Sequence, residues 1–555
     1  MHNSAQRHRM GSMEPRHLLV SACLTLLAAP TLVAQEEGLA PLTEQQRAAH
    51  VLSRLAYGPR PGEIDRVLEM GVDNWLKNQF GFQESKDPRL EDRLSEFQTL
   101  SMGIAECVAF TATPRQEKST IVEQRLARRK NRIPMEELME SVAFRAVFSE
   151  RQTTEVMTEF WRNHFNVSFT KGQSIYAQMP DYERVVVQQH VWGNFPDMLT
   201  ASATHPAMLN YLDNRLSRKP PSKQQLAELE RRTKRNTGSE ERAEEAVQIA
   251  SQRGLNENYG RELLELHTLG VDNFYKQKDV IAVAECLTGW TIDAKREGTR
   301  QYLFNPDMHV DGNKRVLGKL IREDRDGGPG QGMALLKMLG KHKGTADFIA
   351  MKLVRFLVAD NPPERLVAKV AKTYRKTDGD MVSMLETIIE SEEFWNPANV
   401  RSKFKTPYEF IISALRITGC EIGSLGELER YLVAMGQPIY NCDDPTGYYD
   451  TSDAWLDPGV MALRWEFAVD LANGKVDAVA IPDSFYDQIP IDLPPRLWQH
   501  HLTQLILPGG AGARTRAALA TVTSEYLEKK KVPDLYELGP ELVGLLLGSP
   551  EFQQQ

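Results

Sequence analysis

Helical periodicity runs through almost the whole chain and limits its possible folds more than any other feature of the sequence. In "LTEQQRAAHVLSRLAYGPRPGEIDRVLEMG", near the start, Thr43 can cap an amphipathic helix that stops at Gly58. A later run, from 343 to 395, has similar punctuation, with Thr345 as a predicted N-cap. Alternating strand patterns bounded by turn residues are scarce. The chain is therefore predicted to be mainly α, a large multi-helix globular fold with long loops and little or no sheet.

Length and local composition divide this helical chain into regions. Its 555 residues exceed the size at which one core usually stops growing. Residues 217–254, "SRKPPSKQQLAELERRTKRNTGSEERAEEAVQIASQRG", are rich in both charge signs, so we expect a mobile, solvated insertion in which a Ser222/Gln225 capping box allows short helices. The remainder is expected to form an N-terminal helical region (35–216), a central one (255–475) and a C-terminal one (476–555) packed on the same body.

Residues 1–34 are typical of a secretory signal peptide, with Arg16 before an apolar run and small residues up to Ala34. Cleavage there would give an exported protein, periplasmic or extracellular. Lipid attachment at Cys23 is less favoured, because Cys23 lies near the start of the apolar run. No later segment predicts a transmembrane helix. Cleavage removes three arginines and one glutamate, so the net charge changes from −8 to about −10, which argues against nucleic-acid binding.

Four cysteines follow this segment, too few and too scattered for a disulfide scaffold or a zinc ribbon. Cys420 and Cys442 could close a short loop in an oxidising compartment, or remain thiols. Cys286 lies inside an apolar helical pattern and is expected to be a buried thiol.

The segment "NENYGRELLELHTLG", residues 256–270, carries many polar side chains that could act on a ligand. On a helical wheel, His267 shares the apolar side with leucines, whereas Glu262 lies on the other side. Because the two point in different directions, this helix alone offers no metal-binding His/Glu pair. It is either a core helix with a solvated Asn/Arg/Glu face, or a helix whose chemistry needs residues from elsewhere.

Two other segments contain histidines that could supply those residues. In "MTEFWRNHFNVSF" (157–169), Trp161 and His164 belong to an aromatic stripe that is usually core packing, although the flanking asparagines allow a polar pocket. In "FNPDMHVDGNKRVLGK" (304–319), His309, Asp311 and Lys314 lie in a turn-rich stretch that suits a ligand-binding loop and a solvated turn about equally.

Several motifs occur in an order that resembles a bacterial family, Domain of Unknown Function 1800. They include "HVLSRLAYGPRPGEIDRVLEMGVDNWL", "FWRNHFNVS", "GLNENYGRELLELHTLGV", "DVIAVAECLTGWT", "HVDGNKRVLG" and "KFKTPYEFIISALRITG". The resemblance implies an exported bacterial protein, and it makes an exported partner of a second family, Domain of Unknown Function 1501, more plausible. Polar positions typical of the family are His164, Asn256, Glu257, Asn258, Arg261, Glu262, His267 and His309. Gly260 departs from the family pattern, since an alanine is common there.

Signatures of the common nucleotide and α/β-hydrolase chemistries are absent: the sequence has no Walker loop, Gly-x-Ser-x-Gly elbow, Cys-x-x-Cys or dinucleotide fingerprint. We therefore favour an accessory protein of the cell envelope that binds a partner protein or polymer. The alternative is a hydrolase-like enzyme whose catalytic pocket combines His164, Glu262, His267 and His309, acting by acid/base chemistry or with a divalent metal that activates water. The predicted binding residues are Trp161, Asn256, Asn258, Arg261, Glu265, Trp290, Asp311 and Lys314.

Overall fold

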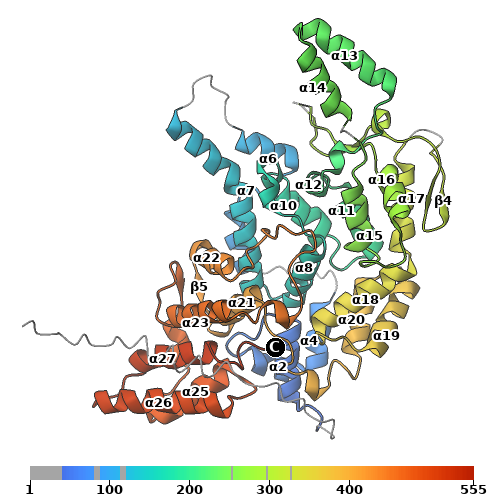
Figure 1. Ribbon diagram of the computed structural model, residues 1–555. Helices are drawn as coiled ribbons and strands as arrows, with labels where there is room; N and C mark the ends of the chain where they lie inside the picture. The colour runs from blue at the N-terminus through green and yellow to red at the C-terminus, as the bar shows by residue number, and fades with distance from the viewer. Residues whose placement is uncertain (1–39, 81–87, 113–119, 252–253, 296–297, 325–327) are drawn as a thin grey trace, which may run out of the picture.

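The computed structural model describes residues 40–80, 88–112, 120–251, 254–295, 298–324 and 328–555. The predicted signal peptide, with Cys23, lies outside these residues. In the part of the chain that is described, helices dominate (Figure 1), and the strands pair into three two-stranded antiparallel sheets. The mainly α class predicted from the periodicity is confirmed.

In the described residues up to 216, all the named elements are helices or helical turns. They are α2 (Glu44–Arg54), α3 (Glu63–Met70), α4 (Val72–Gln79), α5 (Pro88–Ser95), α6 (Ile104–Thr111), α7 (Ile121–Phe148), α8 (Gln152–His164), the 3₁₀ turn η1 (Phe169–Lys171), α9 (Gln173–Tyr176), α10 (Met179–Tyr182), the π-helix η2 (Glu183–Gln188), α11 (Phe195–Thr204), α12 (Pro206–Tyr211) and the 3₁₀ turn η3 (Asn214–Leu216). Thr43 caps α2 as predicted, accepting the Gln46 N–H in a reciprocal capping box.

The charged region 217–254 forms a helical hairpin of α13 (Lys223–Thr237) and α14 (Glu240–Ser251). Ser222 caps α13 together with Gln225, as the sequence predicts. No residue of α13 is buried, and Figure 1 shows the hairpin projecting from the rest of the molecule. The charged side chains of α13 are therefore solvated.

The central part carries most of the side chains that the sequence singled out. Its elements are α15 (Glu257–Glu265), α16 (Gln277–Cys286), β1 (Trp290–Ile292), β2 (Tyr302–Phe304), η4 (Pro306–Met308), β3 (Lys314–Val316), β4 (Lys319–Ile321), α17 (Gly330–Gly340), α18 (Lys343–Leu357), α19 (Glu364–Thr377), α20 (Met381–Ile389) and η5 (Pro397–Asn399). In the two hairpins, Trp290 lies opposite Phe304 and Lys314 opposite Ile321. A Cβ at position 260 would lie 2.9 Å from the Val280 carbonyl oxygen, so α15 can approach α16 this closely only with a glycine there.

The C-terminal part contains α21 (Pro407–Ile417), β5 (Glu421–Ile422), α22 (Gly426–Ala434), η6 (Ser452–Ala454), α23 (Pro458–Ala472), β6 (Val479–Ala480), α24 (Asp483–Tyr486), α25 (Pro495–Ile506), α26 (Ala513–Lys529) and α27 (Leu535–Leu547). β5 pairs with β6, with Glu421 opposite Ala480. The chain then returns to the centre, where Phe404 forms an antiparallel bridge with Gln554. Figure 1 accordingly shows residue 555 beside α2.

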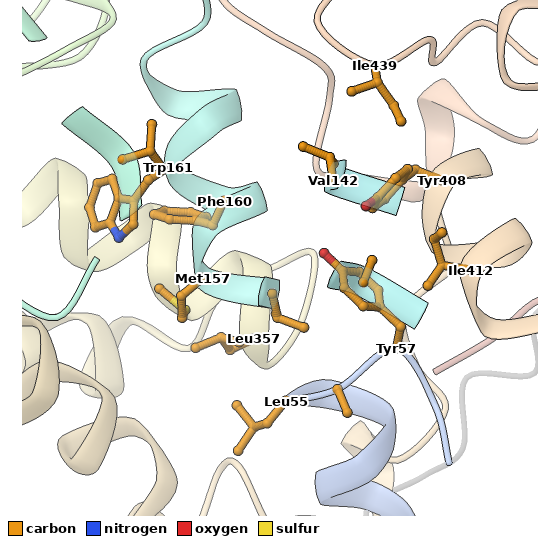
Figure 2. Close-up of a cluster of buried hydrophobic side chains, with 14 of the residues drawn as sticks. Leu55, Tyr57, Val142, Met157, Phe160, Trp161, Leu357, Tyr408, Ile412 and Ile439 are labelled. Atoms are coloured by element: carbon orange, nitrogen blue, oxygen red, sulfur yellow. The ribbon is translucent and has the colours of Figure 1, made fainter. Parts of the chain in front are cut away.

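One connected hydrophobic core joins these parts, with members from α2 through to α27. Figure 2 shows a section of it, where Phe160 lies beside Trp161, Met157 lies near Leu357, and the ring of Tyr57 lies near that of Tyr408. The centroids of the two tyrosine rings are 5.6 Å apart in an edge-on arrangement. Each such side chain contributes roughly 1.5–3 kcal/mol by leaving water.

The predicted cap at Thr345 is wrong, and the structure decides between the two states that the sequence left open for Cys420 and Cys442. The N-cap of α18 is His342, whose Nδ1 accepts the Gly344 N–H, whereas Thr345 is fully buried and donates to the Leu339 carbonyl. Cys420 and Cys442 are free thiols, so the possible disulfide between them is not formed.

Cys286 is a buried free thiol, as predicted. None of the described helices combines the length and the apolar character that a bilayer crossing requires.

Candidate functional site

His164 and His267, which lie in separate segments of the sequence, meet in the core. The Nε2 atom of His164 is 3.3 Å from the His267 carbonyl oxygen, and the two ring centroids are 6.3 Å apart. The ring of the fully buried Trp161 packs edge-on against His164, and Lys352 Nζ lies 3.3 Å from its Nδ1. Each histidine is only 2% exposed. The pair therefore sits in an aromatic environment closed to solvent.

Burial decides the protonation of this pair. It lowers the pKa of His164 well below the usual value, and Lys352 and His267 add to the effect. Burial and Lys352 also lower the pKa of His267 to about 3. Both rings are therefore neutral at physiological pH.

The polar face of α15 forms a hydrogen-bonded network near the surface. Arg261 lies 3.5 Å from Glu265 and donates to Gln277 at 2.8 Å, while the Tyr275 hydroxyl donates to Glu265 at 2.6 Å. Burial raises the pKa of the half-buried Glu262, and the nearby carboxylates of Glu265 and Asp444 raise it further.

The two asparagines of the segment differ. Asn256 is the N-cap of α15, accepting the Tyr259 N–H, and Asn258 is exposed.

His309 contacts a different set of residues. Its Nδ1 lies 2.8 Å from the Thr288 carbonyl oxygen and its Nε2 lies 2.9 Å from Gln331 Oε1. Lys314 also donates to Gln331, at 2.5 Å. The structure thus brings His164 and His267 together and places His309 in a second buried network.

The remaining predicted binding residues are Trp290, fully buried against Tyr302, and Asp311, an exposed carboxylate 3.5 Å from Lys219 Nζ. Among the described residues, no group of three or more His, Cys, Asp and Glu side chains is arranged to hold a metal ion.

A buried ion-pair network lies on the opposite face of α8 from His164. Arg162 Nη2 lies 2.8 Å from Glu183 Oε1, and Arg162 also contacts Glu159 and the Tyr440 hydroxyl. The Tyr440 hydroxyl donates in turn to Glu183. The cavity beside this network has a volume of only about 20 Å³, which is too small for a substrate.

A larger cavity, of about 400 Å³, lies between α2 and α21, and we call it the α2–α21 cavity. Its walls come from α2, the Gly58–Pro59 turn, residues 400–405, α21, and the segments 506–509 and 551–555. Tyr408 and Ile412 of α21 point into the core section in Figure 2, whereas Ser413 and Ile417 of the same helix line the cavity.

Lys405 and Ser413 form a hydrogen-bonded pair in the wall of this cavity. Lys405 Nζ lies 2.9 Å from Ser413 Oγ, and the residues are 7% and 3% exposed. The backbone fixes the pair from two sides: the Lys405 N–H donates to the Gln553 carbonyl at 2.8 Å, and Thr406 begins α21 with a capping box. A Cβ on Gly58 would lie 3.0 Å from Ser413 Oγ, so the glycine leaves room beside the hydroxyl.

The surroundings favour the neutral form of the lysine. Burial, against the opposing charge of Glu409 and with the help of the positive charges of Arg401 and Arg464, lowers the pKa of Lys405 to about 7. A large fraction of this amine is therefore uncharged at neutral pH, and an uncharged amine can accept the proton of a neighbouring hydroxyl.

His50 adds a second neutral polar group to the cavity wall. Its Nε2 lies 2.9 Å from the Phe394 carbonyl oxygen, so this nitrogen carries the proton. Its buried Nδ1, an acceptor, has no hydrogen-bond partner among the described residues. Burial, with Arg54 nearby, lowers the pKa of His50 to about 3, so the ring stays neutral.

Sequence reasoning did not single out Lys405 or Ser413 as functional residues. The spacing of eight residues puts the lysine before the helix and the serine two turns into it. A lysine followed by a serine at that distance is a common arrangement in proteins with no catalytic pair. The signal that distinguishes this pair is burial beside a cavity, which depends on segments from both ends of the chain.

Comparison with known proteins assigns the chain to a family. The family model described as "Protein of unknown function (DUF1800)" matches residues 50–554, a range that includes the histidine segments and the Lys405–Ser413 pair. No curated protein and no solved structure matches the chain. The chain belongs to the DUF1800 family.

Proposed function

We propose that the protein is a hydrolase that cleaves a carboxylic ester or amide, with Ser413 as nucleophile and Lys405 as general base. The observation that carries the proposal is the 2.9 Å contact between Lys405 Nζ and Ser413 Oγ in the wall of a 400 Å³ cavity. A nucleophile within hydrogen-bond reach of a base, beside a space for the substrate, is the arrangement that acyl transfer requires. Serine–lysine pairs are a known variant of the serine–histidine arrangement.

In the first half of the reaction, neutral Lys405 Nζ takes the Ser413 Oγ–H proton as Oγ bonds to the acyl carbon. The carbonyl becomes a tetrahedral oxyanion. When it collapses, the bond to the leaving group breaks, and the ammonium of Lys405 returns the proton to the leaving oxygen or nitrogen. An acyl-serine ester remains at position 413.

In the second half, water attacks the acyl-serine and gives its proton to Lys405. The ester bond then breaks, Ser413 Oγ regains a proton and a carboxylic acid leaves. Three glutamines, Gln45, Gln46 and Gln554, are among the residues that line the same cavity, and a side-chain amide is an N–H donor of the kind that stabilises an oxyanion.

This proposal keeps the hydrolase alternative from the sequence but moves the chemistry to other residues. His164 and His267 lie in the closed aromatic environment described above, and neither lines the α2–α21 cavity. The accessory-protein hypothesis predicts, in contrast, that Ser413 has no unusual reactivity.

Covalent labelling tests the proposal. A fluorophosphonate probe should form one adduct on the purified chain: Ser413 Oγ bonds to phosphorus, the phosphorus–fluorine bond breaks, and fluoride leaves. Peptide mass spectrometry should place the adduct at Ser413, and Ser413→Ala should not be labelled. Ser141→Ala, which removes an equally buried hydroxyl from α7, should label like the unmodified chain. No adduct, or an adduct at another serine, would overturn the proposal.

We also propose that residues 1–34 direct export and that a partner of the Domain of Unknown Function 1501 family binds the exported chain. The apolar run before Ala34 supports export, and the projecting α13–α14 hairpin offers a solvated surface for the partner. Recovery of the chain outside the cytoplasm with a new N-terminus near Gln35 would support export; an intact Met1 there would contradict cleavage. Co-purification of the partner should be lost when the hairpin is deleted, and retention would contradict hairpin binding.

A further inference from the structure

The α2–α21 cavity contains an arginine whose surroundings indicate what kind of substrate the cavity takes. Arg401 lines the same cavity as Ser413 and Lys405, and its positive charge acts on Lys405. It belongs to the segment 400–405, so the arginine is four residues from the lysine.

The backbone and its neighbours hold Arg401 in an unusual position. Its φ angle is +54°, in the left-handed region that non-glycine residues rarely adopt. The guanidinium lies so close to Gly509 that a Cβ there would be 2.0 Å from Arg401 Nη2. Nη1 also donates to the Gly510 carbonyl at 3.3 Å. A strained backbone and a glycine wall thus fix the arginine at the cavity, a combination that tends to persist at functional sites.

Among the described residues, Arg401 forms no direct ion pair with a carboxylate, and its guanidinium donates to a backbone carbonyl instead. The nearest counter-charge is the carboxylate of Glu551, which acts on the guanidinium without direct contact and opposes the lowering of the Arg401 pKa by burial. The carboxylate of Glu551 also lines the cavity, but its oxygens accept the Gly512 N–H at 2.6 Å and the Thr515 hydroxyl at 2.8 Å. A partly buried guanidinium without a direct carboxylate contact retains unfilled hydrogen-bonding capacity, and an anionic ligand would fill it through charge-assisted hydrogen bonds.

We propose that Arg401 binds an anionic group of the substrate, so that the protein hydrolyses esters or amides whose acyl part carries a carboxylate. The planar guanidinium matches a carboxylate in two parallel hydrogen bonds, which a lysine does not reproduce. The inference rests on the hydrolase function proposed above and gives its substrate class.

A neighbouring cavity leaves space for the rest of such a substrate. It has a volume of about 670 Å³ and shares five lining residues with the α2–α21 cavity: Gln45, Pro59, Ile417, Leu507 and Pro508. Its wall also contains Ile64 and Leu505. A substrate can therefore place its anionic group at Arg401 and extend its other end along a partly apolar wall.

Paired substrates of equal chain length test the inference. The purified chain should hydrolyse mono-p-nitrophenyl glutarate with a kcat/KM about tenfold or more above that for p-nitrophenyl pentanoate, since charged hydrogen bonds are worth at least that factor. Arg401→Gln should remove the preference, and Arg401→Lys should keep part of it. Arg132→Gln removes the same charge from the exposed face of α7 and should change neither value. Thermal unfolding shows whether each variant is folded.

A binding measurement separates this inference from the hydrolase proposal. Calorimetry should detect binding of glutarate to the Ser413→Ala variant. When Arg401→Gln is added to that variant, the Kd for glutarate should rise about tenfold or more. Turnover that depends on Ser413 but is equal for both esters would overturn the substrate class and leave the hydrolase function intact. Glutarate binding that is unchanged by Arg401→Gln would overturn the role of Arg401. Absence of labelling at Ser413 would overturn the hydrolase proposal itself, whatever glutarate does.

Discussion

Replacing Ser413 with alanine is expected to lower kcat/KM for ester hydrolysis by roughly 10³- to 10⁶-fold, because the variant has no oxygen to form the acyl intermediate. The change removes one buried hydroxyl, which forms a hydrogen bond of 2.9 Å with Lys405 Nζ. It leaves the apolar contacts of α21 in place, so the fold should survive. Initial rates across a series of p-nitrophenyl esters measure the loss.

Ser141→Ala is the matched control for this prediction. Ser141 is 3% exposed, lies within α7 and donates to the Leu138 carbonyl at 2.8 Å. It should retain the activity of the unmodified chain. If Ser413→Ala hydrolysed the esters as fast as Ser141→Ala, the nucleophile would be a different group.

Replacing Glu183 with alanine is expected to cost about 3–5 kcal/mol of stability, because it leaves a buried charge network without its central acceptor. Glu183 is 1% exposed and accepts from Arg162 at 2.8 Å and from the Tyr440 hydroxyl. The loss appears as a lower denaturant midpoint with an unchanged m value.

Glu136→Ala, which breaks an exposed pair with Arg132, is the matched control and should cost less than about 1 kcal/mol. The triple change Arg162→Met, Glu183→Leu and Glu159→Gln should recover much of the loss, since it leaves no charged member of the network without its partner. A cost for Glu183→Ala as small as that of Glu136→Ala would show that water compensates the network.

Much of the fold follows from local sequence chemistry. The caps at Thr43, Ser222 and Asp380 form where a short polar side chain precedes a helical pattern. The cap predicted at Thr345 is wrong because Thr345 lies inside the fold, where its hydroxyl bonds to the Leu339 carbonyl, and His342 takes its place. Tertiary burial overrides the local preference there.

The candidate site is less predictable, because tertiary contacts assemble it. The wheel of the segment 256–270 puts His267 on the apolar side, and the structure buries it, but α15 already ends at Glu265. The contact of His267 with His164 spans 103 residues, and no periodicity encodes it. The α2–α21 cavity likewise needs α2, α21 and residues 551–555 together. A serine and a lysine near each other in sequence indicate a catalytic pair only when the fold buries them beside such a cavity.

The most direct test of the Ser413–Lys405 pair is the rate of Ser413 labelling as a function of pH. Burial lowers the pKa of Lys405 to about 7, and the base acts when it is neutral. The labelling rate should therefore rise about tenfold per pH unit below pH 7 and level off above it. Lys405→Arg, which keeps the positive charge but cannot act as the base, should abolish this rise. A rate that is the same from about pH 5 to about pH 9, or that Lys405→Arg leaves unchanged, would contradict the pair.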